Sequence, residues 1–291
     1  MISQTPILSI CIPTYNRSKF LSEALDSIII SLTGFEDKVE IIISDNASSD
    51  DTVDAVKKYL SKYNFIKYSR NKDNVADKNF FIVASLAMGK YIWIFADDDK
   101  MEEKAVTNVL NYIKQNYNLI ICNYSTWDNE FKVKFKEKFY SVSKNIEFDD
   151  HNKVLKRLGN KLQFLSSIVI KKDIFFNLDE EEYNSLHEYG ASFAFSLYCG
   201  IINNVKAILI SEPQLRYRGY NSDIVGLDRW YKYFATGTSL LFEELRKKGY
   251  SNSAIYSAKN IVMKTYIMHD ISYRKRTGEN LSGTIKLILP Y

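Results

Sequence analysis

The sequence predicts an α/β fold in which a mostly parallel central sheet is flanked by helices. Through the first 125 residues, short apolar runs alternate with longer segments whose apolar residues recur at helical spacing. The short runs are continuously apolar, which is typical of parallel strands that helices cover on both faces. The expected strands are 8–13, 39–43, 66–69, 91–95 and 118–123, and the expected helices are 18–32, 48–62, 79–88 and 102–115.

Local signals predict where these elements begin and end. The first strand ends at Pro13, which cannot donate to a sheet ladder. In the second helix, Ser48 offers an N-cap, with Asp51 three residues on. The third helix ends at Gly89, and Glu102 opens the fourth, where the helix dipole favours a negative charge. The first helix is predicted from the spacing of its apolar residues: Phe20, Leu21, Ala24, Leu25, Ile28 and Ile29.

Beyond residue 125 the pattern is looser. We expect residues 126–225 to continue the sheet begun by residues 1–125, and residues 226–291 to form a basic helical C-terminal segment. Extended segments are expected at 131–140, 164–170 and 205–218, and helical ones at 183–198 and 230–273.

Composition and charge limit the class of protein. Of the 291 residues, 46% are hydrophobic and 25% are charged, which is typical of a globular protein. The formal net charge is +4, and residues 228–291 alone carry eleven Lys/Arg against five Asp/Glu. That segment is either a solvated helical face or a surface that meets phosphate or anionic lipid. Nothing resembles a nucleic-acid-binding module, so no nucleic-acid partner is expected.

Cysteine usage and hydropathy limit the class of protein further. Cys11, Cys122 and Cys199 stand far apart, which indicates neither a zinc site nor a disulfide framework. Cys11 and Cys122 lie in apolar runs and are predicted to be small buried hydrophobes. No signal peptide is recognised, and no apolar run approaches the roughly 20 residues that span a bilayer. A cytoplasmic location is therefore expected.

Polar clusters follow three of the predicted strands. Thr14–Arg17 follows the first strand, Ser44–Asn46 the second and Asp97–Asp99 the fourth. In parallel sheets, ligands bind outside the carboxyl ends of the strands. The three clusters are therefore expected to converge at one edge of the sheet.

The acidic triplet Asp97–Asp99 indicates a cation. Adjacent carboxylates raise one another's pKa unless a cation compensates them, and Mg²⁺ often binds one or two carboxylates plus substrate phosphates. The alternative is a solvated turn that caps the helix beginning near Glu102. The position at the sheet edge favours the metal. Neither GxGxxG nor GxxxxGK[ST] is present, which argues against a Rossmann cofactor site and a P-loop.

Three motifs together resemble the family 2 glycosyltransferases of the GT-A fold. They are IPTYNR at residues 12–17, ISDNASSD at 43–50 and GKYIWIFADDD at 89–99. Residues 45–48 and 93–95 look most like the abequosyltransferase-type branch. The resemblance implies inverting, metal-dependent sugar transfer from a nucleoside-diphosphate sugar donor to a glycan or lipid-linked acceptor. It also implies a role in bacterial surface polysaccharide synthesis, of O-antigen or capsule.

The resemblance also implies site residues. Residues 1–125 are expected to bind the donor and residues 126–225 the acceptor. Mn²⁺ or Mg²⁺ is expected at Asp98 and Asp99, with Asp98 the first choice. The family's glycine in the stretch near the nucleotide is Ala76 here. The residues expected to contact the nucleotide sugar are Pro13, Thr14, Tyr15, Arg17, Asp45, Asn46, Asn74, Lys78, Asp97 and Arg218.

Two of these expectations rest on side-chain chemistry. Arg218 follows an extended run and could bring a guanidinium group to the diphosphate, or it could be an exposed arginine on an edge strand. The amide of Asn46 can both donate and accept, whereas the usual acid there cannot donate to cytosine. We therefore hypothesise that a cytidine donor is tolerated or preferred.

The general base is expected between residues 178 and 190. An inverting transfer needs a group that takes the proton of the acceptor hydroxyl. Glu188 is the first choice and His187 the second, with residues 179–182 as further candidates. The alternative is a charged helix start with no catalytic role.

Two other functions compete with the transferase. A sugar nucleotidyltransferase would carry a glycine-rich segment after the first strand, and residues 13–17 lack one. A non-catalytic nucleotide-sugar-binding subunit would bind the donor without turning it over. The basic C-terminal segment adds the expectation of peripheral contact with an anionic membrane.

Overall fold

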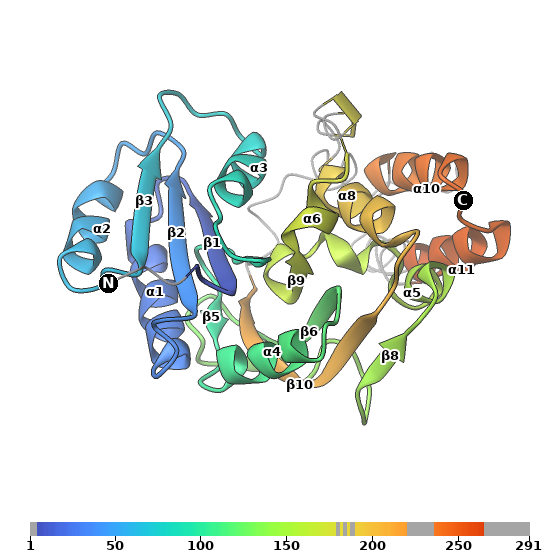
Figure 1. Cartoon of the computed structure of the whole chain (residues 1–291), viewed down its shortest axis with the longest axis horizontal. Coiled ribbons are helices and arrows are strands. Elements are labelled where there is room, and N and C mark those ends of the chain that lie inside the picture. The colour runs from blue at the N-terminus through green and yellow to red at the C-terminus, as the bar shows by residue number, and fades with distance from the viewer. Residues whose placement is uncertain (1–4, 179–180, 183–184, 187–189, 220–235, 265–291) are drawn as a thin grey trace, which may run out of the picture. The chain divides into compact units, whose positions relative to one another are not determined.

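A computed structural model describes residues 5–178, 181–182, 185–186, 190–219 and 236–264 (Figure 1). The chain divides by its internal contacts into two compact units. The described residues of the first unit come from 5–147, 164–174 and 206–219, and those of the second from 148–163, 175–205 and 236–264.

A ten-stranded sheet runs through the first unit. Its strands are β1 (Leu8–Thr14), β2 (Val39–Asp45), β3 (Ile66–Arg70), β4 (Tyr91–Ile94), β5 (Lys100–Met101), β6 (Leu119–Trp127), β7 (Lys134–Lys136), β8 (Ile146–Phe148), β9 (Ile168–Lys171) and β10 (Ala207–Arg218). Their order is β3-β2-β1-β4-β9-β6-β10-β5, with β7 paired to β6 and β8 to β10. The strands β1 to β4 are parallel, as are β6 and β10, whereas β9 runs antiparallel to both β4 and β6. The predicted α/β fold with a mostly parallel sheet is confirmed.

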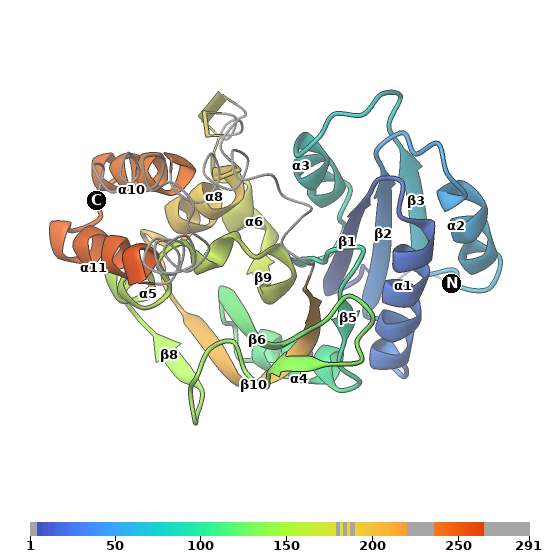
Figure 2. The same cartoon turned by 180° about the vertical axis from the view of Figure 1, so that it is seen from behind.

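Helices cover both faces of strands β1 to β3. Helices α1 (Ser18–Leu32) and α2 (Thr52–Leu60) lie on one side, and α3 (Lys78–Ser85) lies on the other (Figures 1 and 2). Helix α4 (Ala105–Lys114) packs against α1. The apolar stripe predicted for α1 is buried at Leu21, Ala24, Leu25 and Ile28. This double cover explains why β1 and β2 are buried along their whole length.

A buried carboxylate links three strands to the turn before β4. Glu40 Oε1 accepts from Ser9 Oγ at 2.5 Å and from the Met88 N–H at 2.7 Å, and its Oε2 accepts from Lys67 Nζ at 2.6 Å. Ser9 Oγ also accepts from the Gly89 N–H at 2.8 Å. A Cβ at Gly89 would lie 2.7 Å from Ser9 Oγ and 2.8 Å from Ser9 N, so only glycine fits this turn.

Local signals were wrong at two places in the first unit. Ser48 does not cap α2, which begins at Thr52; its hydroxyl accepts from the Asn16 N–H at 2.9 Å instead. The alternating segment 131–140 forms only the short strand β7, whose residues are exposed. For Ser48, a contact 32 residues away in sequence replaced the predicted cap.

The second unit is helical in its described part. It contains α5 (His151–Leu158), the 3-10 helix η1 (Gly159–Gln163), α8 (Ser192–Ile201), α10 (Thr238–Lys247) and α11 (Asn252–Val262). The single long helix expected after residue 230 is broken at Gly249, whose φ of 104° ends α10, and Ser251 caps α11 through the Ala254 N–H. No helix within the described residues is long and apolar enough to cross a bilayer. Cys11 and Cys122 are buried, as predicted, and unpaired.

Candidate active site

The carboxyl ends of β1, β2 and β4 bring the predicted polar clusters to one edge of the sheet. Thr14 lies opposite Asp45 in the β1–β2 register, and β1 also pairs with β4, which leads to Asp97. Thr14 Oγ1 donates to Asp97 Oδ2 at 2.7 Å across 83 residues of sequence. The predicted convergence of the first and third clusters is thus confirmed for Thr14 and Asp97.

Arg17 bridges two members of the acidic triplet. Its Nη1 donates to Asp97 Oδ1 at 3.0 Å and to Asp98 Oδ2 at 2.7 Å. Burial and the charge of Asp98 raise the pKa of Asp97 to about 6, although Arg17 lowers it. Burial likewise raises the pKa of Asp98, against the lowering effect of Arg17 and Arg218. The cationic group that the structure shows at the triplet is the Arg17 guanidinium, and the expected divalent ion stays a prediction.

Asp99 lies deepest of the three. Its Oδ1 accepts from the Arg218 N–H at 3.0 Å, and its Oδ2 is buried without a hydrogen bond from any residue that the structure describes. Burial and the charge of Asp98 raise the pKa of Asp99 well above its ordinary value, while the Ser166 hydroxyl nearby lowers it. An acceptor oxygen in that position suits a proton or a cation.

Arg218 is enclosed by protein. Its side chain is 3% exposed, its Nε donates to the Asp98 backbone oxygen at 2.7 Å, and its Nη2 donates to Glu23 Oε2 at 2.7 Å. Its Nη1 donates to the Asn129 backbone oxygen. The guanidinium carbon lies 4.7 Å and 4.2 Å from the ring centroids of Phe20 and Phe131. The expected contact of Arg218 with a diphosphate stays a prediction, and the observed contacts give it a role in holding the triplet.

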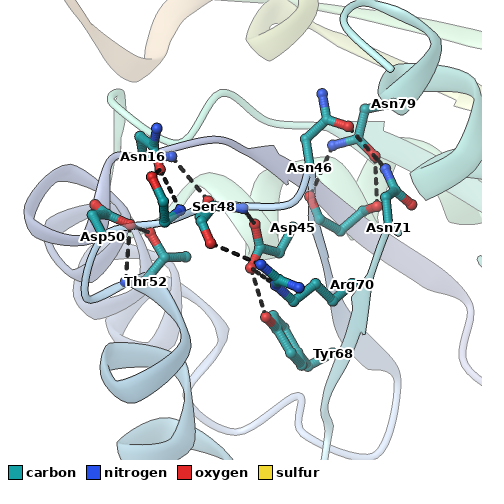
Figure 3. A network of polar contacts seen from close by, with 12 residues as sticks. Asn16, Asp45, Asn46, Ser48, Asp50, Thr52, Tyr68, Arg70, Asn71 and Asn79 are labelled. Atoms are coloured by element: carbon teal, nitrogen blue, oxygen red, sulfur yellow. Dashed lines mark hydrogen bonds and ion pairs between the residues drawn. The ribbon is translucent and has the colours of Figure 1, made fainter. Parts of the chain in front are cut away.

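Asp45 is completely buried and fully engaged (Figure 3). Its Oδ1 accepts from the Ser48 N–H at 2.8 Å, and its Oδ2 accepts from Tyr68 Oη at 2.7 Å. Arg70 Nε lies 3.3 Å from the same Oδ2 and completes an ion pair. Burial and the hydrogen bond to Asp45 raise the pKa of Tyr68, which therefore stays a neutral donor. Asp45 thus fixes the loop after β2 against β3.

The Asn46 amide is saturated by the loop between β3 and α3. Its oxygen accepts from Asn71 Nδ2 at 3.0 Å and from the Val75 N–H at 2.9 Å. Its Nδ2 donates to Asn74 Oδ1 at 2.7 Å and to the Ala76 backbone oxygen at 3.3 Å. Asn71 Nδ2 also donates to Asn79 Oδ1 at 2.9 Å, and Figure 3 shows Asn46, Asn71 and Asn79 close together. Asn46 therefore shapes the stretch that was expected near the nucleotide.

The other expected donor residues differ in exposure. Tyr15 is 44% exposed and follows β1 directly, so its ring is available to a ligand. Pro13 is buried within β1, and Lys78 is exposed at the first residue of α3. Asn74 is exposed beside Asn46.

The expected general bases lie outside the described residues. These are Glu188 and His187, together with residues 179–180 of the further candidates. Among the further candidates that the structure describes, Glu182 forms an ion pair within the second unit, with its Oε1 2.5 Å from Lys248 Nζ.

Sequence reasoning missed several residues that build the site. Glu23, Ser166, Tyr68 and Arg70 hold the carboxylates or their partners, yet each lies far in sequence from its partner. Of these four residues, only Arg70 could have been identified from the sequence, because it directly follows a predicted strand at the same edge of the sheet.

The acidic triplet suits a cation site that substrate and water complete better than a site whose ligands all come from the protein. No group of three or more His, Cys, Asp or Glu side chains in the described part of the chain could by itself hold a metal ion. However, Asp97 and Asp98 already point one oxygen each at a shared cationic group, and Asp99 Oδ2 accepts no hydrogen bond from the described residues. Mg²⁺ commonly takes one or two carboxylates and completes its shell with substrate phosphates and water.

Comparison with known proteins assigns the family. The family model described as glycosyl transferase family 2 matches residues 9–176. The chain belongs to this family. The abequosyltransferase RfbV of Salmonella typhimurium is 29% identical over 233 residues, which cover 74% of this chain and 67% of that protein. The expected glycosyltransferase class and its abequosyltransferase-like character are thereby confirmed.

Solved structures of glycosyltransferases share the fold. The crystal structure of S. aureus TarS 1–349 superposes with a TM-score of 0.66 at 15% identity, over 90% of this chain and 73% of that one. The mannosyltransferase PcManGT from Pyrobaculum calidifontis, solved with GDP-Man and Mn²⁺, gives a TM-score of 0.58 at 14% identity, over 98% and 79%. The GT-A fold of this family 2 member is therefore confirmed.

Proposed function

We propose that this family 2 member transfers a sugar from a nucleoside-diphosphate sugar to a glycan or lipid-linked acceptor, with inversion, in bacterial surface polysaccharide synthesis. One observation carries the proposal: the buried carboxylates of Asp97 and Asp98 both accept from a single cationic group, Arg17 Nη1. Such a pair at the carboxyl edge of a parallel sheet suits a cation, and that cation would in turn bind the negatively charged diphosphate leaving group. The similarity to an abequosyltransferase supports hexosyl or deoxyhexosyl transfer and a role in O-antigen or capsule synthesis.

Asp98 and Asp99 would hold Mn²⁺ or Mg²⁺. The Asp98 side chain is 10% exposed and faces the Arg17 guanidinium, and Asp99 Oδ2 is a buried oxygen that accepts no hydrogen bond within the described part of the chain. The Mn²⁺ in the complex of PcManGT supports this choice. When bound, the ion would neutralise charge on the leaving diphosphate.

The chain's own residues would orient the donor. Tyr15, exposed beside Thr14, would pack against the base. Asp45 and Asn46 would contribute by holding the surrounding loops, since their polar atoms are engaged with the chain. Arg17 and Lys78 would meet the phosphates, because both carry exposed positive charge at this edge.

Glu188, with His187 as the second choice, would take the proton from the acceptor hydroxyl as the new glycosidic bond forms. This assignment rests on sequence, as does the expected contact of the basic residues in 226–291 with an anionic membrane. Glu188→Gln tests it: transfer is expected to fall at least about a hundredfold while nucleotide binding is kept. Loss of transfer in His187→Gln alone would move the role to His187.

Two measurements test the function. The first is thermal shift with UDP, CDP, GDP and dTDP, each with and without Mn²⁺; we expect one nucleotide to stabilise the protein only with the metal. The second is hydrolysis of the matching sugar nucleotide with and without EDTA. Asp98→Asn is expected to abolish both effects with an unchanged circular dichroism spectrum, whereas Asp54→Asn, at an exposed residue of α2, keeps them. Full activity of Asp98→Asn would overturn the metal assignment.

A further inference from the structure

The loop that carries Arg17 is fastened without the help of its guanidinium group. The Asn16 N–H donates to Ser48 Oγ at 2.9 Å, and Asn16 Oδ1 accepts from the Ser49 N–H at 2.7 Å. The Ser18 N–H donates to Asp50 Oδ2 at 3.1 Å. These bonds join the β1–α1 loop to the β2–α2 loop on both sides of Arg17. The guanidinium can therefore change partners while the backbone of the loop stays in place.

The two arginines at the triplet differ in their exposure to solvent. The Arg218 side chain is 3% exposed, and it is held by Glu23, by two backbone oxygens and by two aromatic rings. The Arg17 side chain is 40% exposed, whereas those of its partners Asp97 and Asp98 are 6% and 10% exposed. Because solvent and ligands reach Arg17 more readily than Arg218, Arg17 is the arginine of this pair that an incoming cation would meet first.

We propose that Arg17 is a built-in counterion of Asp97 and Asp98 that competes with the divalent cation for the carboxylate of Asp98. The inference rests on the proposed metal-dependent function. A divalent ion held by Asp98 and Asp99 would be repelled by a guanidinium 2.7 Å from Asp98 Oδ2, so free metal binds weakly while Arg17 stays there. The diphosphate of the donor offers the guanidinium an alternative anionic partner. Metal binding is thereby coupled to the arrival of the nucleotide.

Through this coupling, the buried carboxylates have a positive charge beside them even when no substrate is bound. Asp97 and Asp98 are 5% and 7% exposed as whole residues, so leaving them without a cation would be costly. Arg17 supplies that cation in the free protein. By linkage, nucleotide and metal must each strengthen the binding of the other, and removing Arg17 must weaken this mutual effect.

Electron paramagnetic resonance of Mn²⁺ tests the proposal on the full chain, with and without the nucleotide that gives the largest thermal shift. We expect Arg17→Gln to bind Mn²⁺ at least about tenfold more tightly than the unmodified protein when no nucleotide is present. The enhancement of Mn²⁺ binding by nucleotide should shrink in this variant. Arg17→Lys keeps the charge and should lie between the two. Without metal, Arg17→Gln should melt at a lower temperature, and Mn²⁺ should restore much of the loss.

Arg216→Gln is the matched control. The Arg216 side chain is 41% exposed and is paired with Glu102 at 2.9 and 3.0 Å, so the same charge is removed at similar exposure. Its Mn²⁺ affinity should stay within about twofold of the original, as expected for a half-exposed charge that is paired with Glu102 and not with the triplet carboxylates. The role of Arg17 would be overturned if Arg17→Gln bound Mn²⁺ no more tightly than the unmodified protein. The proposed function would still stand in that case, provided that the unmodified protein binds Mn²⁺ and Asp98→Asn abolishes this binding. No Mn²⁺ binding by any form, even with nucleotide, would overturn both.

Discussion

Arg218 donates its Nε–H to the backbone oxygen of Asp98 at 2.7 Å, although 120 residues separate the two in sequence. The same residue donates its backbone N–H to Asp99 Oδ1, so the end of β10 holds two consecutive members of the triplet. The position of the acidic residues therefore depends on a strand that follows them by more than one hundred residues.

Replacement of Arg218 should loosen this arrangement. Arg218→Met removes the side-chain donor of the Asp98 backbone oxygen and leaves Glu23 with Lys100, 3.1 Å away, as its remaining ion-pair partner, so it should lower the free energy of unfolding by about 3 kcal/mol. Arg218→Lys keeps the charge but not the planar set of donors, so it should be intermediate. Denaturant unfolding measures both. Arg216→Lys, at a half-exposed ion pair, should change stability by about 0.5 kcal/mol or less. Equal losses at the two positions would contradict the role of Arg218.

Ala76 stands where the resemblance expects glycine, and its φ is 50°. A left-handed backbone costs an alanine roughly 1–2 kcal/mol, while glycine tolerates it. The hydrogen bonds at Ala76 use only its backbone, so Ala76→Gly keeps them. We expect a gain in unfolding free energy of about 0.5–1 kcal/mol, after the larger entropy of glycine in the unfolded chain is subtracted. Ala55→Gly within α2 should instead lose about 1 kcal/mol. A loss at both positions would contradict the strain at Ala76.

Glu40 should make stability depend on acid pH. Burial pushes the pKa of Glu40 upward, but the donors Lys67, Ser9 and Met88 outweigh it and hold the pKa below the ordinary value. The stabilisation is therefore complete above the unfolded-state pKa of about 4.3 and is lost as pH falls through the lower folded pKa. Glu40→Gln should be less stable at neutral pH and should lose less stability below about pH 4.5. Urea unfolding between pH 7 and pH 3 measures this, with the exposed Glu103→Gln as the control. Parallel pH curves for Glu40→Gln and the unmodified protein would argue against it.

Periodicity predicted the first half of the fold well because local and tertiary preferences agree there. The bounds expected for α1 are those observed, and β1 to β4 lie within one or two residues of their expected ends. The same agreement placed Thr14 and Asp97 at one edge of the sheet. Ser48 shows the limit: a capping pattern was present, but the hydroxyl accepts from Asn16, 32 residues away.

The partners of the charged side chains could not be predicted from the sequence. Arg17 and Arg218 reach the triplet across 80 and 120 residues, and both contacts depend on strand order and loop geometry. Strand β10 lies between β6 and β5 in the sheet, and no sequence period encodes that neighbour. The motifs therefore indicated which residues gather at the edge of the sheet. The fold decides which of these side chains face a ligand and which instead hydrogen-bond to other side chains of the site.

Asn46→Asp separates two roles for Asn46. The Asn46 Nδ2 now donates to Asn74 Oδ1 at 2.7 Å and to the Ala76 backbone oxygen at 3.3 Å. In the variant, a carboxylate oxygen would face these two acceptor oxygens and could not donate to them. We expect a loss of about 1–3 kcal/mol in unfolding free energy. Because the loop between β3 and α3 would shift as a whole, the affinities for CDP and UDP should fall by the same factor. Calorimetry with both nucleotides, each with Mn²⁺, measures that ratio.

Asn108→Asp provides the comparison. Asn108 in α4 also donates from Nδ2 to a single side-chain oxygen, Gln214 Oε1 at 2.9 Å, but it lies away from the loop. It should lose stability without changing either nucleotide affinity. A changed ratio of CDP to UDP in Asn46→Asp would show that the residue reads the base directly, as the donor and acceptor capacity of an amide allows. An unchanged ratio with weaker binding of both would show that Asn46 acts through the loop, because all four of its hydrogen-bonding positions are already used there.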